Sequence, residues 1–271
     1  MRVALKIAYD GTRFHGFARQ PDVRTVEGEV LRSLLRAKLV DDPRTARFAG
    51  ASRTDRGVSA VGNVIAFNTS WRPDAVVGAF NDKAEDVGAW AFAEVPDDFH
   101  PRHAIERWYR YHLFDDTLQD RVQEAMTLFV GDHDFGSFTT EPSARTFALH
   151  RIDVLDEAGA TVIDIRARSF GRGMVRRIVA AAVAYARAKA DLDEIQGALG
   201  GSRRDFGMVP PEPLFLMDVN YDMPFRAVPR GKVLDHWHAV ERDSALRLRL
   251  SRAVLAAIES RRETSPWPNI N

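Results

Sequence analysis

The chain has 271 residues, no cysteine, and 38 basic against 38 acidic residues, so its formal net charge is zero. Without cysteine it has no disulfide, thiolate nucleophile or thiolate metal site, which leaves carboxylates, histidines and hydroxyls as reactive groups. No apolar run reaches transmembrane length, and charge breaks the apolar positions at the start of the chain, so we expect a soluble, cytoplasmic protein without a secretory signal.

The first hundred residues predict alternating strands and helices. Apolar residues at every second position are typical of half-buried strands, and Asp10-Gly11 and Asp41-Asp42-Pro43 are typical of turns. The predicted elements are a strand at 3–9, a helix capped by Thr25 that runs to about Val40, strands at 45–48 and 61–67, a helix at 74–83 and a strand at 88–95.

The remaining residues again predict strands and helices in alternation, followed by a separate tail. The predicted elements are a strand at 107–114, a helix at 119–129, a hairpin at 148–168 that turns at 157–159, a helix at 174–190 and a strand at 214–221. Pro224, Pro229 and Gly231 indicate a linker. An amphipathic helix is then expected from Ala239 to Arg262, with one apolar stripe made of Leu246, Leu250, Val254, Ala257 and Ile258. We expect it to pack on the body of the protein or on a second subunit.

An aspartate between arginines is the most informative local feature. It lies in the segment Ser52-Arg53-Thr54-Asp55-Arg56-Gly57, which precedes a predicted strand. Such charge patterns usually belong to solvated loops with weak ion pairs. Here, however, small residues come before the motif and let a partner approach closely. A carboxylate beside guanidinium groups on a tight turn is also a suitable nucleophile for sugar chemistry.

A second feature is a basic stretch without acids between Arg166 and Lys189. Arg168, Arg172 and Arg176 recur every four residues within it. If these residues are already part of the predicted helix, the three arginines share one helix face. If residues 169–171 instead form a turn, the arginines gather at the N-terminus of that helix. Both geometries attract phosphate, whereas the alternative interpretation is a solvated cationic helix face.

Several motifs together resemble the tRNA pseudouridine synthase A family, whose signature is close to Gly-Arg-Thr-Asp-x-Gly-Val-His-Ala. The match to it is Ser52-Arg53-Thr54-Asp55-Arg56-Gly57-Val58-Ser59-Ala60. Further matches follow in the family's order over about residues 3 to 221: Tyr9-Asp10-Gly11, Val95-Pro96-Asp97-Asp98-Phe99-His100, Arg107-Trp108-Tyr109-Arg110-Tyr111, Asp134-Phe135, Met174-Val175-Arg176 and Leu214-Phe215-Leu216.

The resemblance implies an α+β fold with two ferredoxin-like (RRM-like) lobes, whose antiparallel sheets flank a central cleft. We expect an N-terminal lobe at 1–100 that carries the aspartate loop, a C-terminal lobe at 101–225, and a linker with the final helix at 226–271. It also implies a homodimer that isomerises uridine to pseudouridine at nucleotides 38 to 40 of the tRNA anticodon stem-loop. The reaction is neither a redox step nor a hydrolysis, so we expect no cofactor and no metal.

The resemblance also assigns roles to individual residues. Asp55 matches the catalytic aspartate, and Arg53, two residues earlier, is expected to position the substrate. Tyr109 matches the tyrosine that stacks on the target base, although a tyrosine in a strand more often simply packs in the core. Leu214 or Leu216 matches a leucine of the uracil pocket. Arg168, Arg172 and Arg176 are expected to bind the substrate through its phosphates.

Some positions depart from the family pattern, and two other functions stay open. The chain has Val58-Ser59-Ala60 where the signature has Val-His-Ala, which bears on tRNA contacts but leaves Asp55 and Arg53 in place. The alternatives are a non-catalytic RNA-binding module and a nucleoside or glycoside hydrolase. Hydrolases generally need a second carboxylate at a fixed separation, and the Asp55 motif offers none nearby in sequence. The sequence does not choose between a nucleophilic and a glycal route.

Overall fold

The computed structural model describes residues 1–115, 118–141, 146–157, 159–228 and 231–262. Contacts divide the chain into two compact units, Met1–Val228 and Pro229–Asn271. The first unit holds every sheet strand and every candidate site residue named above. The second is described as a single helix, α6 (Lys232–Arg262).

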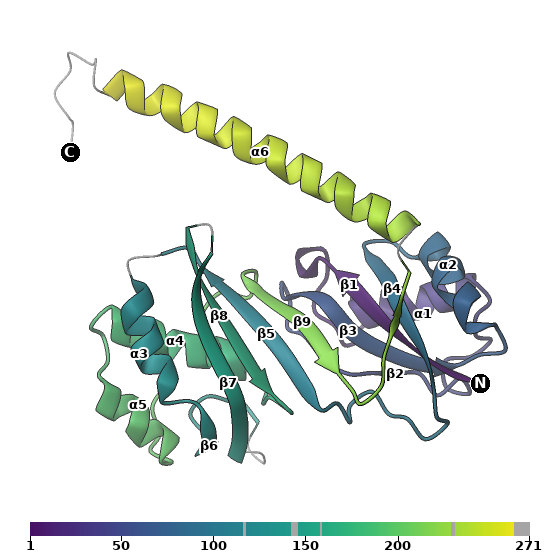
Figure 1. Ribbon diagram of the computed structural model, residues 1–271, viewed down its shortest axis with the longest axis horizontal. Coiled ribbons are helices and arrows are strands. Elements are labelled where there is room, and N and C mark those ends of the chain that lie inside the picture. Colours follow the sequence, from purple (N-terminus) through teal and green to yellow (C-terminus); the bar gives the residue numbers. More distant parts are fainter. Residues whose placement is uncertain (116–117, 142–145, 158, 229–230, 263–271) are drawn as a thin grey trace. The chain divides into compact units, whose positions relative to one another are not determined.

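One sheet forms the frame of the first unit (Figure 1). Its strands are β1 (Arg2–Tyr9), β2 (Ala49–Gly50), β3 (Ser59–Asn68), β4 (Val87–Val95), β5 (Glu106–Leu113), β6 (Gly131–Asp134), β7 (Thr146–Glu157), β8 (Ala160–Ala167), β9 (Leu214–Asn220) and β10 (Arg226–Ala227). They follow the order β10-β4-β1-β3-β9-β5-β8-β7-β6, and β2 pairs with β3. The neighbouring strands are antiparallel except β3 and β9, which run parallel.

Helices cover the sheet in two groups (Figure 1). The helices are α1 (Val26–Arg36), α2 (Pro73–Lys83), α3 (Gln119–Thr127), α4 (Met174–Ala186) and α5 (Leu192–Leu199), with a short 3-10 turn, η1 (Gly11–Arg13). Helices α1 and α2 pack together and against β4, whereas α3 packs on α4 and β7. Their apolar faces and the inner faces of the strands form one continuous buried core.

The predicted α+β class is confirmed, but the strands of the two predicted lobes lie in one sheet. The junction is the parallel pairing of β3 with β9, where Ser59 is opposite Phe215 and Ala60 is opposite Leu216. Because β3 follows the aspartate loop directly and β9 is flanked by β5, this junction brings the loop close to the strand that carries Tyr109.

Most predicted elements occur with ends shifted by a few residues, and one is wrong. The segment 45–48 is a turn instead of a strand, since Ala46 N donates to Asp42 O at 2.9 Å and Arg47 has a φ of 51°. Helix α1 ends at Arg36 rather than near residue 40, and α4 ends at Ala186 rather than at 190. The expected cap is present, because the Thr25 hydroxyl accepts from Gly28 N at 3.2 Å.

Sequence reasoning missed α5, although its start is clear in the structure. Asp191 accepts a hydrogen bond from Glu194 N at 2.8 Å, and the Glu194 carboxylate accepts one from Asp191 N at 3.1 Å. This reciprocal pair is a capping box, which satisfies amide groups that a helix N-terminus leaves free. The acidic residues that follow the basic stretch, Asp191, Asp193 and Glu194, therefore lie at the start of a helix.

The helix of the second unit begins earlier than predicted. Helix α6 starts at Lys232, seven residues before the expected Ala239, and continues to Arg262. Two residues of the expected apolar stripe, Ala257 and Ile258, have side chains outside the described part of the chain, as does the expected linker residue Pro229. In the described part of the chain, no helix combines the length and the apolar content needed to cross a bilayer.

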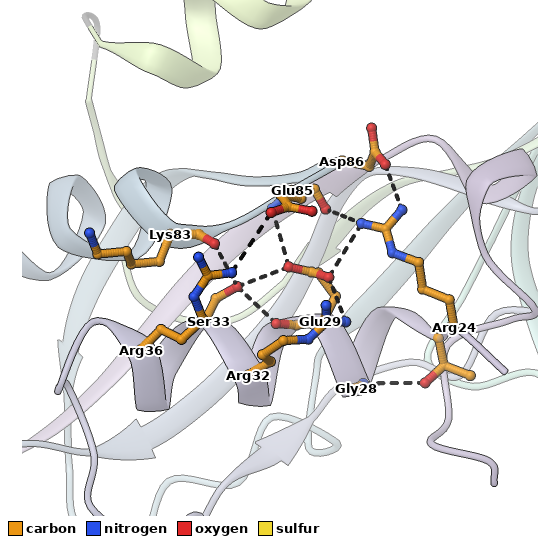
Figure 2. Close-up of polar contacts among 10 residues, drawn as sticks. Arg24, Gly28, Glu29, Arg32, Ser33, Arg36, Lys83, Glu85 and Asp86 are labelled. Carbon is orange, nitrogen blue, oxygen red and sulfur yellow. Dashed lines mark hydrogen bonds and ion pairs between the residues drawn. The ribbon is translucent and has the colours of Figure 1, made fainter. Parts of the chain in front are cut away.

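A buried carboxylate ties α1 to the segment that follows α2 (Figure 2). The Glu29 side chain is 0% exposed and accepts from Glu85 N at 3.2 Å and from Arg32 at 2.8 Å. Arg24 contacts both Glu29, at 3.3 Å, and Asp86, at 2.6 Å. Buried charge is tolerated only when it is paired and hydrogen-bonded, and this network supplies both conditions.

Candidate active site

The loop between β2 and β3 carries Asp55, and neighbouring elements hold its backbone. Phe17 N donates to Thr54 O at 3.0 Å, and the Asn63 side chain donates to Ser52 O at 2.9 Å. The buried Thr54 hydroxyl lies 2.9 Å from the Tyr9 hydroxyl. Each bond comes from a different part of the first hundred residues, so the loop has a defined path.

Two glycines accommodate the tight turn after Asp55, one within the turn and one in the segment packed against it. Val58 N donates to Asp55 O at 3.2 Å, and Gly57 within this turn has a φ of 87°, a conformation that glycine adopts without strain. The turn packs against Gly11, where an added Cβ would lie 2.1 Å from Val58 O. The motif Asp10-Gly11 thus leaves room for the loop.

Asp55 forms an ion pair with Arg176, which is 121 residues away in sequence. Its Oδ2 lies 3.1 Å from Arg176 Nη1, and the Arg176 Nε donates to Val209 O at 2.8 Å. The Arg176 side chain is 12% exposed and that of Asp55 is 32% exposed. One carboxylate oxygen is therefore held by a nearly buried guanidinium, while the group as a whole keeps access to a ligand.

This pairing differs from what the sequence predicts. Arg53 and Arg56 flank Asp55 but are exposed, and neither forms an ion pair with a residue that the structure describes. The guanidinium at Asp55 belongs instead to Arg176, which the sequence analysis placed among phosphate-binding arginines. Only the fold can show this, since the contact joins the loop to the first turn of α4.

Tyr109 lies on β5 opposite Ile165 of β8 and Leu216 of β9. It is buried, and its ring meets that of Phe170 edge to face at a centroid distance of 5.2 Å. Burial raises the pKa of Tyr109 to about 12, and the negative charge of Asp55 adds to this rise. The phenol is therefore neutral at physiological pH, and the influence of Asp55 places the two side chains in the same region.

Leu214 and Leu216 share the face of β9 that meets the tyrosines of β5. Leu214 is opposite Tyr111, and Leu216 is opposite both Tyr109 and Ala60. Their exposed fractions are 5% and 0%. Leu216 thus adjoins both Tyr109 and the start of β3, while Leu214 lies one position further along the same face.

The remaining candidate arginines of the basic stretch lie between β8 and the start of α4. Arg168 and Arg172 are exposed in the connection between β8 and α4, and Arg176 follows in the first turn of that helix. The turn interpretation of residues 169–171 is therefore confirmed, and the alternative of one continuous helix face is wrong. Among the described residues, His, Asp and Glu form no group of three able to hold a metal ion.

Sequence reasoning missed three residues near the aspartate loop. Ser52 is buried, and Arg107 of β5 donates to its hydroxyl at 3.1 Å. Glu212, which is exposed, approaches the turn, because a Cβ added to Gly57 would lie 3.3 Å from its Oε1. A second carboxylate therefore lies near the Asp55 loop in space, although none lies near it in sequence. Nothing in the local sequence of any of the three indicated these contacts.

A family model described as tRNA pseudouridine synthase matches residues 125–222. The matched segment is similar to the class of pseudouridine synthases. Among solved structures, a chain of the crystal structure of a Cbf5-Nop10-Gar1 complex is 13% identical, with 72% of this chain and 54% of that chain covered. Its TM-score of 0.30 is too low to support an argument about the fold.

Curated relatives are more specific. A tRNA pseudouridine synthase A of Pyrococcus furiosus is 43% identical over 82% of this chain and 84% of its own. One of Thermococcus sibiricus is 41% identical over 82% and 85%, and one of Methanococcoides burtonii is 37% identical over 94% and 96%. The chain belongs to the tRNA pseudouridine synthase A family.

Proposed function

We propose that this protein isomerises uridine to pseudouridine in tRNA, with Asp55 as its catalytic residue. The reaction breaks the bond between N1 and C1′ and forms one between C5 and C1′. The proton leaves C5 and a proton is gained at N1, so atoms balance without water, oxidant or reductant. A single carboxylate can start this sequence, either by attack or by proton removal.

The observation that carries the proposal is the setting of Asp55. Its backbone is held on both sides, one oxygen is bound by Arg176 at 3.1 Å, and its side chain is 32% exposed. A catalytic group must be accessible to substrate yet fixed in orientation, because misplacement by about 1 Å costs rate on the order of 10²-fold. Asp55 combines both properties.

Tyr109 and the leucines of β9 are suited to bind the target base once it has left the stack. A uridine in a stacked loop must be turned out of the stack, and the lost stacking must be replaced by apolar and aromatic side chains. We assign this role to Tyr109, with Leu214 or Leu216 beneath the base. The neutral phenol has no charge that would oppose stacking.

The substrate is proposed to be the anticodon stem-loop, bound by a homodimer. The net charge is zero, but three exposed arginines are linked to the aspartate loop along the chain. Arg53 precedes Asp55 by two residues, and Arg168 and Arg172 lie in the connection that leads to α4, the helix whose Arg176 pairs with Asp55. Phosphate contacts depend on such local charge rather than on the total. Arg176 is left out of this group, since its guanidinium is held by Asp55 and Val209.

The lobes at 1–100 and 101–225 are proposed as two ferredoxin-like halves of the one sheet. The support is the pairing between them, which joins β3 to β9 over only two residue pairs, while β1, β3 and β4 and likewise β5, β8 and β9 pair over most of their lengths. A strand junction of this kind is what two docked sheets would form.

The decisive experiment measures pseudouridine formation by tritium release from tRNA labelled at uridine C5. The wild type is expected to release tritium without free uracil. Asp55→Ala and the isosteric Asp55→Asn are expected to lose release while binding tRNA with nearly unchanged affinity. Arg56→Ala, next to Asp55 and exposed, is the matched control for a charge change in the same loop. Full activity in Asp55→Asn would exclude Asp55 as the catalytic group.

The same assay separates the other functions. Free uracil from the wild type would indicate a hydrolase, and the approach of Glu212 to the Asp55 turn keeps that outcome chemically reasonable, because hydrolases use two carboxylates. Binding of tRNA with neither tritium release nor uracil would indicate an RNA-binding module.

A further inference from the structure

Arg107 is a buried arginine whose hydrogen bonds all go to neutral groups. It lies on β5, is 8% exposed, and shares the strand face of Tyr109 two residues later. No carboxylate among the described residues forms an ion pair with it. A buried charge without a counter-ion is expensive and is retained only when many hydrogen bonds satisfy it. Its acceptors therefore show what it holds in place.

Those acceptors come from three separate segments. Nε donates to the Ser52 hydroxyl at 3.1 Å, and Nη2 donates to Ala51 O at 3.3 Å, both in the loop that leads to Asp55. Nη2 also donates to Arg102 O at 2.9 Å, and Nη1 donates to Arg168 O. One guanidinium thus joins the aspartate loop, the segment before β5 and the connection after β8.

The planar guanidinium makes this connection rigid. Its donors point in fixed directions, so the positions of the acceptors follow from the position of the group. Burial lowers the pKa of Arg107 from its ordinary value, which reflects the cost of keeping the charge inside. A lysine has one rotatable ammonium on a flexible chain and does not reproduce a planar fork that spans three segments.

Ser52 connects the same group to the aspartate loop. Its hydroxyl accepts from Arg107 at 3.1 Å, and Tyr109 follows Arg107 by two residues on the same face of β5. The glycine that the signature motif has at this position has no hydroxyl and does not allow this contact. Arg107 therefore links the strand that carries Tyr109 to the loop that carries Asp55.

We propose that Arg107, acting through Ser52, is a positioning residue that sets Asp55 and Tyr109 in register with each other. This inference rests on the proposed function, because it concerns the same reaction. Arg107 touches no reacting atom in this account. It acts by fixing the loop at residues 51 and 52 relative to β5, three residues before the carboxylate.

The test compares three variants of the full chain by kcat and KM for tRNA and by unfolding midpoint. Arg107→Lys is expected to lower kcat by roughly 10- to 100-fold, the range for misplacement by about 1 Å, with KM changed by less than about twofold. Ser52→Ala keeps three of the four bonds of Arg107 and is expected to lower kcat by a smaller factor.

The matched control is Arg110→Lys, on the same strand but in an ion pair with Asp164 at 2.8 Å, away from the aspartate loop. It is expected to lower the unfolding midpoint and leave kcat unchanged. Wild-type kcat in both Arg107→Lys and Ser52→Ala, or an equal kcat loss in Arg110→Lys, would overturn the positioning role. If Arg107→Lys does not fold, unchanged kcat in Ser52→Ala overturns it alone. A wild type without pseudouridine product refutes the proposed function itself.

Discussion

Replacement of Arg176 distinguishes the role that the structure indicates from the role that the sequence suggests. Arg176→Met keeps the length of the side chain and removes its charge, so Asp55 loses its ion pair and Val209 O loses its donor. If Arg176 orients the carboxylate, the loss falls on the chemical step. If it were a phosphate contact, the loss would fall on tRNA binding.

The size of the effect follows from the distance. Unit charges 3.1 Å apart attract by about 5 kcal/mol at an effective dielectric constant of 20, and by about 1.3 kcal/mol in bulk water. Asp55 is 32% exposed, so the pair lies between these limits, and about 2 kcal/mol is a reasonable value. Each 1.36 kcal/mol is tenfold, so the oriented carboxylate becomes roughly 30-fold less populated.

We therefore expect Arg176→Met to lower kcat by roughly 30-fold, with KM for tRNA changed by less than about threefold. Arg176→Lys keeps the charge, but one ammonium does not span Asp55 and Val209 O as the guanidinium does, so an intermediate loss is expected. Tritium release under single-turnover conditions measures the chemical step. Unchanged kcat with a raised KM and a salt slope reduced by about one would refute this reasoning and favour a phosphate contact.

Two further predictions concern stability. Glu29→Ala leaves Glu85 N and Arg32 without their acceptor and removes one acceptor of Arg24, which keeps Asp86, so urea denaturation is expected to show a loss of about 2 to 4 kcal/mol. Asp74→Ala, which removes an exposed ion pair, is expected to cost less than about 1 kcal/mol. Equal losses would contradict the role of burial. Burial raises the pKa of Tyr109 to about 12 from 10.0, so its stabilisation is complete below pH 10 and disappears as pH rises through about 12, because the unfolded state ionises first. Tyr109 is expected to contribute about 3 kcal/mol to the fall in the free energy of unfolding across this window, in addition to the contributions of Tyr9, Tyr111 and Tyr221, whose pKa values burial also raises. The fall is therefore expected to be smaller by about this amount in Tyr109→Phe, and identical pH dependence in both proteins would refute the assignment.

Local sequence signals predicted most elements because their causes are local. Thr25 caps α1 through its own hydroxyl, and alternation of apolar residues produced β1 and β3 nearly as expected. The prediction at 45–48 is wrong because hydrogen bonds of the preceding turn, from Asp42 onward, override the strand pattern. Helix α5 was missed because its first turn reads as an acidic surface until its reciprocal capping bonds are seen.

The site was predictable in its members but not in its pairings. The signature motif pointed to Asp55, and the charge pattern suggested its arginine neighbours as partners. In the structure, Asp55 forms its ion pair with Arg176 instead. The first turn of α4 lies beside the loop, although it is 121 residues later in the chain. The contacts of Arg107 have the same origin, since Ser52 is 55 residues away in sequence. Contacts between distant segments leave no mark in either local sequence.

The contacts that hold the aspartate loop are separate from the Glu29 network. The position of Asp55 and the stability of the fold should therefore respond to different substitutions. Tyr9, Phe17 and Asn63 hold the loop from the first hundred residues, whereas Arg107 and Arg176 hold it from segments later in the chain than residue 100. Loss of any of these bonds is expected to move the carboxylate within a folded protein, and so to change kcat. Among the described residues, the Glu29 network makes no hydrogen bond or ion pair to the loop, so its loss is expected to reduce the folded fraction without moving the carboxylate. Activity per folded molecule should therefore separate the two kinds of variant.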